Sequence, residues 1–275
     1  MSGEKKFFLR PLIIFVQVFC LFTQTACAKK NEVKAELVNP EVKKLQKVLS
    51  SMSDRCKNAI PNGDSAEFLK DLNAVLESEK DFSSDDLSPF YLIDKKHNVG
   101  DSYVPANLIH LENCANFNVN KNNLNLRPEA FEALNKMGQA AKADGVTLTV
   151  SSTYRSYQYQ VNLFNYWVEQ DGLEEAERES ARAGTSQHQL GLAMDFAPVD
   201  DAFAQTVAGK WVYEHAGDFG WSLSFPQGYE DITGYRWESW HFRYIGVKAV
   251  QFQKKWFSDV QQFMIEFIDA WKKAE

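Results

Sequence analysis

Three side chains that are common zinc ligands fall within two short stretches of this chain. His188 and Asp195 lie seven residues apart, and small or apolar residues surround the aspartate. A buried carboxylate without a partner is costly, so an aspartate in such a run needs one. Further along, His241 follows Glu238 by three residues. Two histidines and one aspartate supply three protein ligands and leave a fourth position open, which is typical of a catalytic zinc site and not of a closed structural one.

The two stretches also match two motifs of a known family. The patterns S-x-H-x-x-G-x-A-x-D and E-x-W-H-x-R-Y resemble those of the VanY-type D-alanyl-D-alanine carboxypeptidases, zinc peptidases of the bacterial cell wall (LAS type). The resemblance runs from about Ser88 to about Gly246, so both ends of the chain lie outside it. Every fixed position of both motifs is present: Ser186, His188, Gly191, Ala193, Asp195, Glu238, Trp240, His241, Arg243 and Tyr244.

The resemblance implies one Zn²⁺ ion with a general base beside it. In the family, the glutamate that corresponds to Glu238 takes the proton of a zinc-activated water. The alternative for Glu238 is a salt bridge with Arg236 or Arg243, and the alternative for the two histidines is a place in the core. The chain has no H-E-x-x-H motif, which excludes a thermolysin-like or metzincin peptidase. The implied metal ligands are His188, Asp195 and His241.

Four further residues are candidates for binding the substrate. Arg155 lies where a predicted strand turns into a helix, and its guanidinium could pair with the terminal carboxylate of a peptide. In the resembled family the arginine of a similar S-x-Y-R-S segment binds the peptide, the glutamine matching Gln160 assists, and the serine matching Ser186 contacts the substrate. Trp240 either walls the substrate pocket or packs in the core. The alternatives are a salt bridge for Arg155 and a structural role for Gln160.

Hydrophobic periodicity predicts a mixture of helices and strands in which Asp195 lies on a strand. The resemblance implies the α+β class, with a small, mostly antiparallel sheet flanked by helices and an N-terminal helical extension. An aromatic stripe near the C-terminus is typical of core packing. The main predicted elements are helices at 42–60, 65–80, 127–144, 157–170 and 247–273 and strands at 89–93, 146–151, 192–197 and 240–245.

The first residues predict export. Basic residues precede an apolar run at 11–22, so residues 1–26 read as a signal peptide. Cleavage before Cys27 would give a lipoprotein anchored through that cysteine in the periplasm or cell envelope; cleavage by ordinary signal peptidase and an uncleaved anchor are the alternatives. Residues 27–86 are then a tether and helical extension, and residues 87–275 a zinc carboxypeptidase domain with a C-terminal helix.

Composition narrows the set of partners. The formal net charge of −7 argues against nucleic acid, which requires a basic footprint. We expect a monomer that meets the membrane only through its signal or lipid anchor. Cys56 and Cys114 either form a disulfide, as an exported protein permits, or remain as two buried free thiols.

The function that the resemblance implies is zinc-dependent hydrolysis of the terminal D-Ala-D-Ala bond of peptidoglycan stem peptides. An L,D-carboxypeptidase that acts on tetrapeptide stems would use the same ligands. A dipeptidase for free D-Ala-D-Ala depends on loops that the sequence does not define. The more distant alternative is a non-catalytic, zinc-bearing module that binds the cell wall, and the presence of Glu238 argues against it because a binder needs no base.

Overall fold

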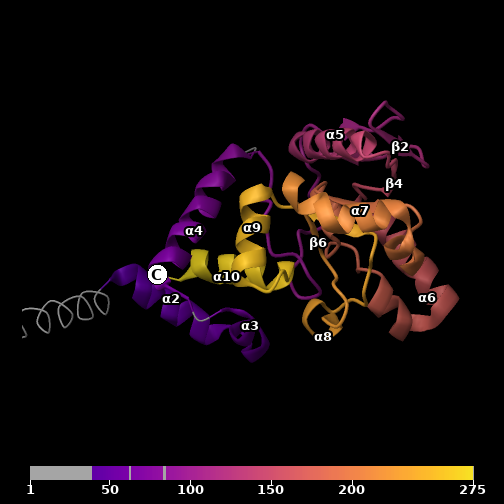
Figure 1. The fold of residues 1–275 in the computed structure, drawn as a ribbon. Helices are drawn as coiled ribbons and strands as arrows, with labels where there is room; N and C mark the ends of the chain where they lie inside the picture. The colour runs from indigo at the N-terminus through magenta and orange to yellow at the C-terminus, as the bar shows by residue number, and fades with distance from the viewer. Residues whose placement is uncertain (1–38, 62, 83–84, 275) are drawn as a thin grey trace, which may run out of the picture.

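The computed structural model describes residues 39–61, 63–82 and 85–274 of the chain. The predicted signal peptide and Cys27 lie outside these residues. Figure 1 shows two groups of elements side by side: a group of helices from both ends of the chain, and a sheet with its own helices from the middle of the chain. Each group has its own cluster of buried apolar side chains.

A five-stranded sheet with the strand order β2-β4-β5-β7-β6 forms the centre of the second group. β2 and β4 are parallel, and all the other neighbours are antiparallel. All four residues of β5 are buried, so both faces of the sheet are covered at its centre. This arrangement confirms the predicted α+β class with a small, mostly antiparallel sheet. The strands are β2 (Phe117–Val119), β4 (Leu148–Ser152), β5 (Ala193–Phe196), β6 (Trp221–Leu223) and β7 (His241–Tyr244).

Helices flank this sheet. Pro128 begins α5, where its fixed φ suits the first turn, and Leu134 and Met137 join the buried cluster of the sheet. Ser156 caps α6, which is interrupted at Gly172 by a φ of 82°, just beyond the predicted helix at 157–170. The helices are α5 (Pro128–Ala143), α6 (Tyr157–Glu179), α7 (Val207–His215) and the short α8 (Glu230–Thr233), and a small separate pair joins β1 (Ile109–His110) to β3 (Asn125–Leu126).

The first group joins helices from opposite ends of the chain in one core. Phe68 of α4 contacts the rings of Phe252, Trp256 and Phe267 edge to face. These buried rings confirm that the C-terminal aromatic stripe serves core packing. The helices are α2 (Pro40–Ser51), α3 (Asp54–Ala59), α4 (Ser65–Ser78), α9 (Val247–Trp256) and α10 (Gln261–Lys273).

Three of the predicted elements are wrong. The predicted helix at 42–60 is two helices, α2 and α3, because the backbone is extended at Met52 and Ser53 caps a new helix by accepting a hydrogen bond from the backbone of Cys56. The C-terminal segment is not one helix: it breaks between α9 and α10, where Ser258 and Asp259 have φ values of 50° and 60°. The Gln253 amide donates to the carbonyl and the carboxylate of Asp259, which holds this left-handed turn. Residues 89–93 form no strand: residues 89–90 lie in a turn, and residues 91–93 pair with no strand among the described residues.

The two cysteines in the described residues are free thiols. Cys56 is buried in the helical core, and burial raises the pKa of its thiol to about 12. Cys114 is exposed, so the free-thiol alternative is correct although only one of the two thiols is buried. None of the helices in residues 39–61, 63–82 and 85–274 is both long and apolar enough to cross a bilayer.

Candidate functional site

The three predicted metal ligands come together at the end of the central strands. Asp195 on β5 lies directly opposite His241 on β7 in the antiparallel register. His188 belongs to a short 3-10 turn, Gln187–Leu190, that precedes β5. Gly191 ends this turn with a φ of 69°, and a Cβ atom there would meet the Arg127 side chain at 3.1 Å. The S-x-H-x-x-G-x-A-x-D spacing thus brings a turn residue and a strand residue to one point.

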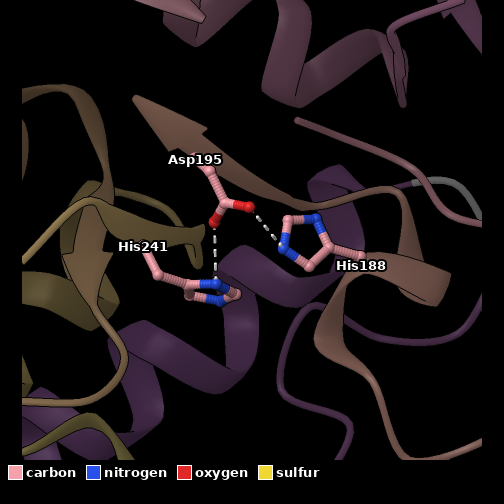
Figure 2. Close-up of side chains that lie close together, drawn as sticks. All are labelled: His188, Asp195 and His241. Carbon is pink, nitrogen blue, oxygen red and sulfur yellow. Dashed lines mark ion pairs between the residues drawn. The ribbon is translucent and has the colours of Figure 1, made fainter. Parts of the chain in front are cut away.

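The aspartate carboxylate lies between the two imidazole rings, with one oxygen toward each (Figure 2). Oδ2 of Asp195 lies 3.3 Å from Nε2 of His188, and Oδ1 lies 3.0 Å from Nδ1 of His241. One ligand atom from each of the three residues falls within 4.8 Å of the other two. All three side chains are buried. In the part of the chain that the structure describes, this is the group with the geometry of a metal site.

The side chains themselves fit a divalent cation. Nε2 of His188 and Oδ1 of Asp195 are buried and have no hydrogen-bond partner among the described residues, although both lie close to other polar atoms. Such unpaired atoms are costly unless something binds them. Nδ1 of His188 lies 2.7 Å from the carbonyl oxygen of Thr153, to which it donates, so the lone pair on Nε2 faces Asp195. Two imidazoles and one carboxylate are the donor set that Zn²⁺ prefers at sites with an open position.

The charges of the site favour metal binding. Burial, and after it the charge of Arg155, lower the pKa of His188 to about 4, so this imidazole is neutral near pH 7. Burial works against ionisation of Asp195, yet His188 and Arg155 hold the pKa of that carboxyl well below its usual range. A neutral histidine and an ionised aspartate are the states in which these side chains bind metals.

Glu238 lies beside this cluster without pairing with an arginine. Its Oε2 is 3.5 Å from Nδ1 of His241, and the residue is 7% exposed in the same cleft. Arg236 pairs instead with Glu179 and Asp201, and Arg243 donates to backbone carbonyls. Neither structural salt bridge considered for Glu238 is therefore formed.

The pKa of Glu238 fits a group that exchanges protons. Burial raises the pKa of its carboxyl well above the usual range, and the Asp195 carboxylate raises it further. A carboxyl with a raised pKa beside the His188, Asp195 and His241 cluster is suited to general acid–base chemistry near neutral pH.

Arg155 reaches the cleft from the turn between β4 and α6. Its Nη2 donates to Oδ2 of Asp195 at 2.6 Å, and its Nε donates to Oγ of Ser152 at 3.0 Å. These two bonds occupy two of the five N–H groups of the guanidinium, which leaves three for a ligand. The side chain is 19% exposed, so it is accessible from the cleft.

The remaining predicted substrate residues divide into two sets. Ser186 and Trp240 line the cleft, which has a volume of about 240 Å³. The Oγ of Ser186 also accepts a hydrogen bond from the backbone of His188. Gln160 is buried and does not line the cleft; its amide donates to Ser180 and Ala181, two residues that do. The structure therefore places Gln160 behind the wall of the cleft.

Sequence reasoning missed the residues that hold the histidines and those that form one wall of the cleft. The contact between His188 and the backbone carbonyl of Thr153 cannot be read from the sequence, because every residue has a backbone carbonyl. Gln187 lines the cleft, and its Oε1 lies 3.1 Å from Nε2 of His241. Its position next to His188 in the sequence did not indicate a contact with His241, which lies far along the chain. Tyr159, Leu163 and Trp167 line the wall from α6, and their four-residue spacing is the signal that could have identified them.

Comparisons with known proteins agree with this geometry. Residues 123–247 match the family model VanY, described as D-alanyl-D-alanine carboxypeptidase. The chain is 36% identical over 166 residues to the "Putative carboxypeptidase YodJ" of Bacillus subtilis (strain 168), a match that covers 58% of this chain and 61% of that protein. The matched region thus spans less than two thirds of that relative.

Two solved structures share the fold. The LdcB LD-carboxypeptidase is 33% identical with a TM-score of 0.56, and the match covers 66% of this chain and 87% of that chain. A mutant of the vancomycin resistance D,D-pentapeptidase VanY, in complex with Zn(II), is 28% identical with a TM-score of 0.50, and the match covers 58% of this chain and 90% of that chain.

Proposed function

Because this chain belongs to the VanY family of D-alanyl-D-alanine carboxypeptidases, we propose that it is a zinc-dependent enzyme that removes the terminal D-alanine of peptidoglycan stem peptides. The observation that carries the proposal is the convergence of His188, Asp195 and His241 beside Glu238 in one cleft. The similarity of the fold to a zinc-containing D,D-pentapeptidase supports it.

His188, Asp195 and His241 would hold the ion through Nε2, a carboxylate oxygen and Nδ1, the atoms that face one another in Figure 2. When bound, a Zn²⁺ ion supplies the Lewis acidity that lowers the pKa of water and polarises a peptide carbonyl. The carbonyl of Thr153 keeps His188 in the tautomer that this requires.

Glu238 moves the proton. Its carboxylate accepts a proton from the attacking water and then gives it to the nitrogen of the departing D-alanine. The raised pKa of Glu238 suits both steps, because a stronger base accepts the proton more readily and the resulting acid can still release it. The absence of a salt bridge to Arg236 or Arg243 leaves the carboxyl free to cycle between its two states.

Arg155 binds the end of the substrate. Its three unused N–H groups can donate to the terminal carboxylate of the peptide, which fixes the scissile bond relative to the three ligands. Ser186 and Trp240 line the same cleft and would contact the peptide beside it. Gln160 would act indirectly, by holding the segment that contains Ser180 and Ala181.

An L,D-carboxypeptidase is the second candidate. The similarity of this chain to the LdcB LD-carboxypeptidase is somewhat higher than its similarity to the D,D-pentapeptidase, with 33% against 28% identity. The same four residues would perform that reaction on a tetrapeptide stem. Incubation of the zinc-loaded protein with matched pentapeptide and tetrapeptide muropeptides, followed by mass spectrometry, distinguishes the two activities. A non-catalytic wall-binding module would cleave neither peptide.

Action on the cell wall requires export. We propose that residues 1–26 direct the chain out of the cytoplasm and that Cys27 anchors it in the cell envelope, as the basic and apolar pattern of the N-terminus suggests. Replacing Cys27 with serine should release the protein from the membrane fraction if the cysteine carries the lipid.

A further inference from the structure

The two histidines of the candidate metal centre are held in different ways. His188 is oriented by a backbone carbonyl, that of Thr153, which no side-chain substitution removes. His241 is oriented by a side chain: its Nε2 lies 3.1 Å from Oε1 of Gln187. An amide oxygen accepts hydrogen bonds and does not donate them, so this contact requires a hydrogen on Nε2 of His241. The lone pair of Nδ1 then faces Asp195.

A hydroxyl fixes the orientation of that amide. Oγ of Ser224 donates to Oε1 of Gln187 at 2.7 Å, so the same oxygen accepts from both Ser224 and His241. The Gln187 side chain is buried against both partners. A rotation of the amide by half a turn would place its NH₂ group against Nε2, and His241 would then carry its hydrogen on Nδ1. In that state Nδ1 could not bind a metal.

The contacts continue into the C-terminal helices. Oγ of Ser224 lies 3.3 Å from Oε1 of Gln261, and the amide of Gln261 donates to the carbonyl of Ser222. Gln261 begins α10, which lies beyond residues 123–247 that match the family model. All of these side chains are buried, so each hydrogen bond matters more than it would in water.

We propose that Gln187 is a positioning residue of the metal centre: with Ser224 and α10 behind it, it holds His241 in the tautomer that presents Nδ1 to the ion. This inference rests on the zinc site of the proposed function. Gln187 occupies a variable position of the first motif, and Ser224 lies outside both motifs. Partners that orient a metal-binding histidine typically contribute about 10- to 100-fold in metal affinity or activity.

The test measures zinc affinity without substrate, by competition with a chromogenic chelator, on the purified full chain. Gln187→Met keeps the length of the side chain and removes the acceptor. Gln187→Glu keeps an acceptor oxygen at the same place. Gln253→Met is the control for loss of a buried glutamine, because Gln253 is 1% exposed, against 7% for Gln187, and its hydrogen bonds go to Ser222 and Asp259 and not to His241. Visible spectra of the Co²⁺-loaded proteins report the ligand geometry.

The zinc dissociation constant of Gln187→Met should rise about 10- to 100-fold, with an altered Co²⁺ spectrum. Gln187→Glu and Gln253→Met should bind zinc as the wild type does. Ser224→Ala should show a smaller loss in the same direction, and it decides the question if Gln187→Met does not fold. Wild-type affinity in both Gln187→Met and Ser224→Ala overturns the proposal. An equal loss in Gln253→Met also overturns it, because the effect would then be one of general stability.

Zinc affinity separates this inference from the proposed function. A chain that binds zinc tightly, shows the predicted differences and cleaves no peptide would contradict the carboxypeptidase and leave the role of Gln187 intact. If the wild type cleaves the peptide but Gln187→Met and Ser224→Ala bind zinc as tightly as the wild type, the carboxypeptidase is supported and the role of Gln187 is contradicted.

Discussion

Replacing Glu238 with glutamine removes the proposed general base and keeps the size of the side chain. Among the described residues the carboxyl makes one ion-pair contact, with Nδ1 of His241 at 3.5 Å, and it has no arginine partner to be left unpaired. A general base contributes about 10²- to 10⁴-fold to a rate, so the loss corresponds to about 3–5 kcal/mol of transition-state stabilisation. We expect kcat to fall by that factor while zinc stays bound.

The same substitution should not destabilise the metal-free fold. The pKa of Glu238 is raised in the folded state, so the stability associated with this group is fully present below its unfolded pKa and is lost as the pH rises through the folded value. Glutamine does not ionise, so the variant does not lose this stability as the pH rises. The melting temperature of metal-free Glu238→Gln at pH 8 should therefore equal or exceed that of the wild type.

The assay combines the rate of D-alanine release, zinc content by mass spectrometry and thermal melting. Glu266→Gln is the control, because burial also raises the pKa of Glu266 but its side chain lies outside the cleft lining; this variant should turn over at the wild-type rate. A Glu238→Gln protein that keeps zinc and loses less than tenfold in rate would refute the assignment of the base. Loss of zinc would instead make Glu238 a ligand.

Three more predictions follow from the site. His188→Ala should lose zinc and activity together, and dialysis against a chelator followed by zinc should restore activity in the wild type alone; full zinc content in the variant would remove His188 from the ligand set. Arg155→Ala should lower kcat/KM by about 10- to 150-fold on peptides with a free terminal carboxylate, since a hydrogen bond to a charged group contributes about 1.5–3 kcal/mol; equal wild-type kinetics on amidated and free peptides would contradict that role. Because the pKa of His188 is lowered to about 4, the metal-free wild type should lose stability as the pH falls from about 6.5 toward 4, and urea unfolding of His188→Asn should show a smaller dependence over that range.

The sequence predicted that His188, Asp195 and His241 lie together because its motifs coincide with local geometry. Seven residues from His188 to Asp195 are enough for one 3-10 turn, a left-handed glycine and the start of β5. The meeting with His241 depends instead on the register of β5 against β7, which no spacing along the chain determines. It was the family resemblance that supplied this long-range contact.

The C-terminal helices show a limit of periodicity. The apolar spacing continues through Phe257 and Val260, both buried, so the pattern does not register the break at Ser258 and Asp259. A left-handed backbone conformation at these two residues does not change the spacing of apolar side chains, so the hydrophobic pattern cannot predict it. The packing of α4 against α9 and α10, which are far apart in the sequence, could not be predicted either. The sequence of each helix indicates an apolar face but not the helix against which that face packs.

The hydrogen bonds around the site were the least predictable part. Gln187, Ser224 and Gln261 are polar residues in three separate segments, and their contacts exist only once β6, β7 and α10 have packed together. Gln160 shows the converse: a residue expected to touch substrate lies behind the wall of the cleft. Polar side chains of this kind can be assigned only from the folded structure.

The most direct test of the account is mass spectrometry of matched pentapeptide and tetrapeptide muropeptides after incubation with the purified chain, with and without bound zinc. A D,D-carboxypeptidase should remove one alanine from the pentapeptide and none from the tetrapeptide, and removal of zinc should stop the reaction. Loss from the tetrapeptide alone would transfer the same site to the L,D class. Intact peptides in the presence of a protein shown to hold zinc would contradict the central claim that His188, Asp195, His241 and Glu238 form a carboxypeptidase centre.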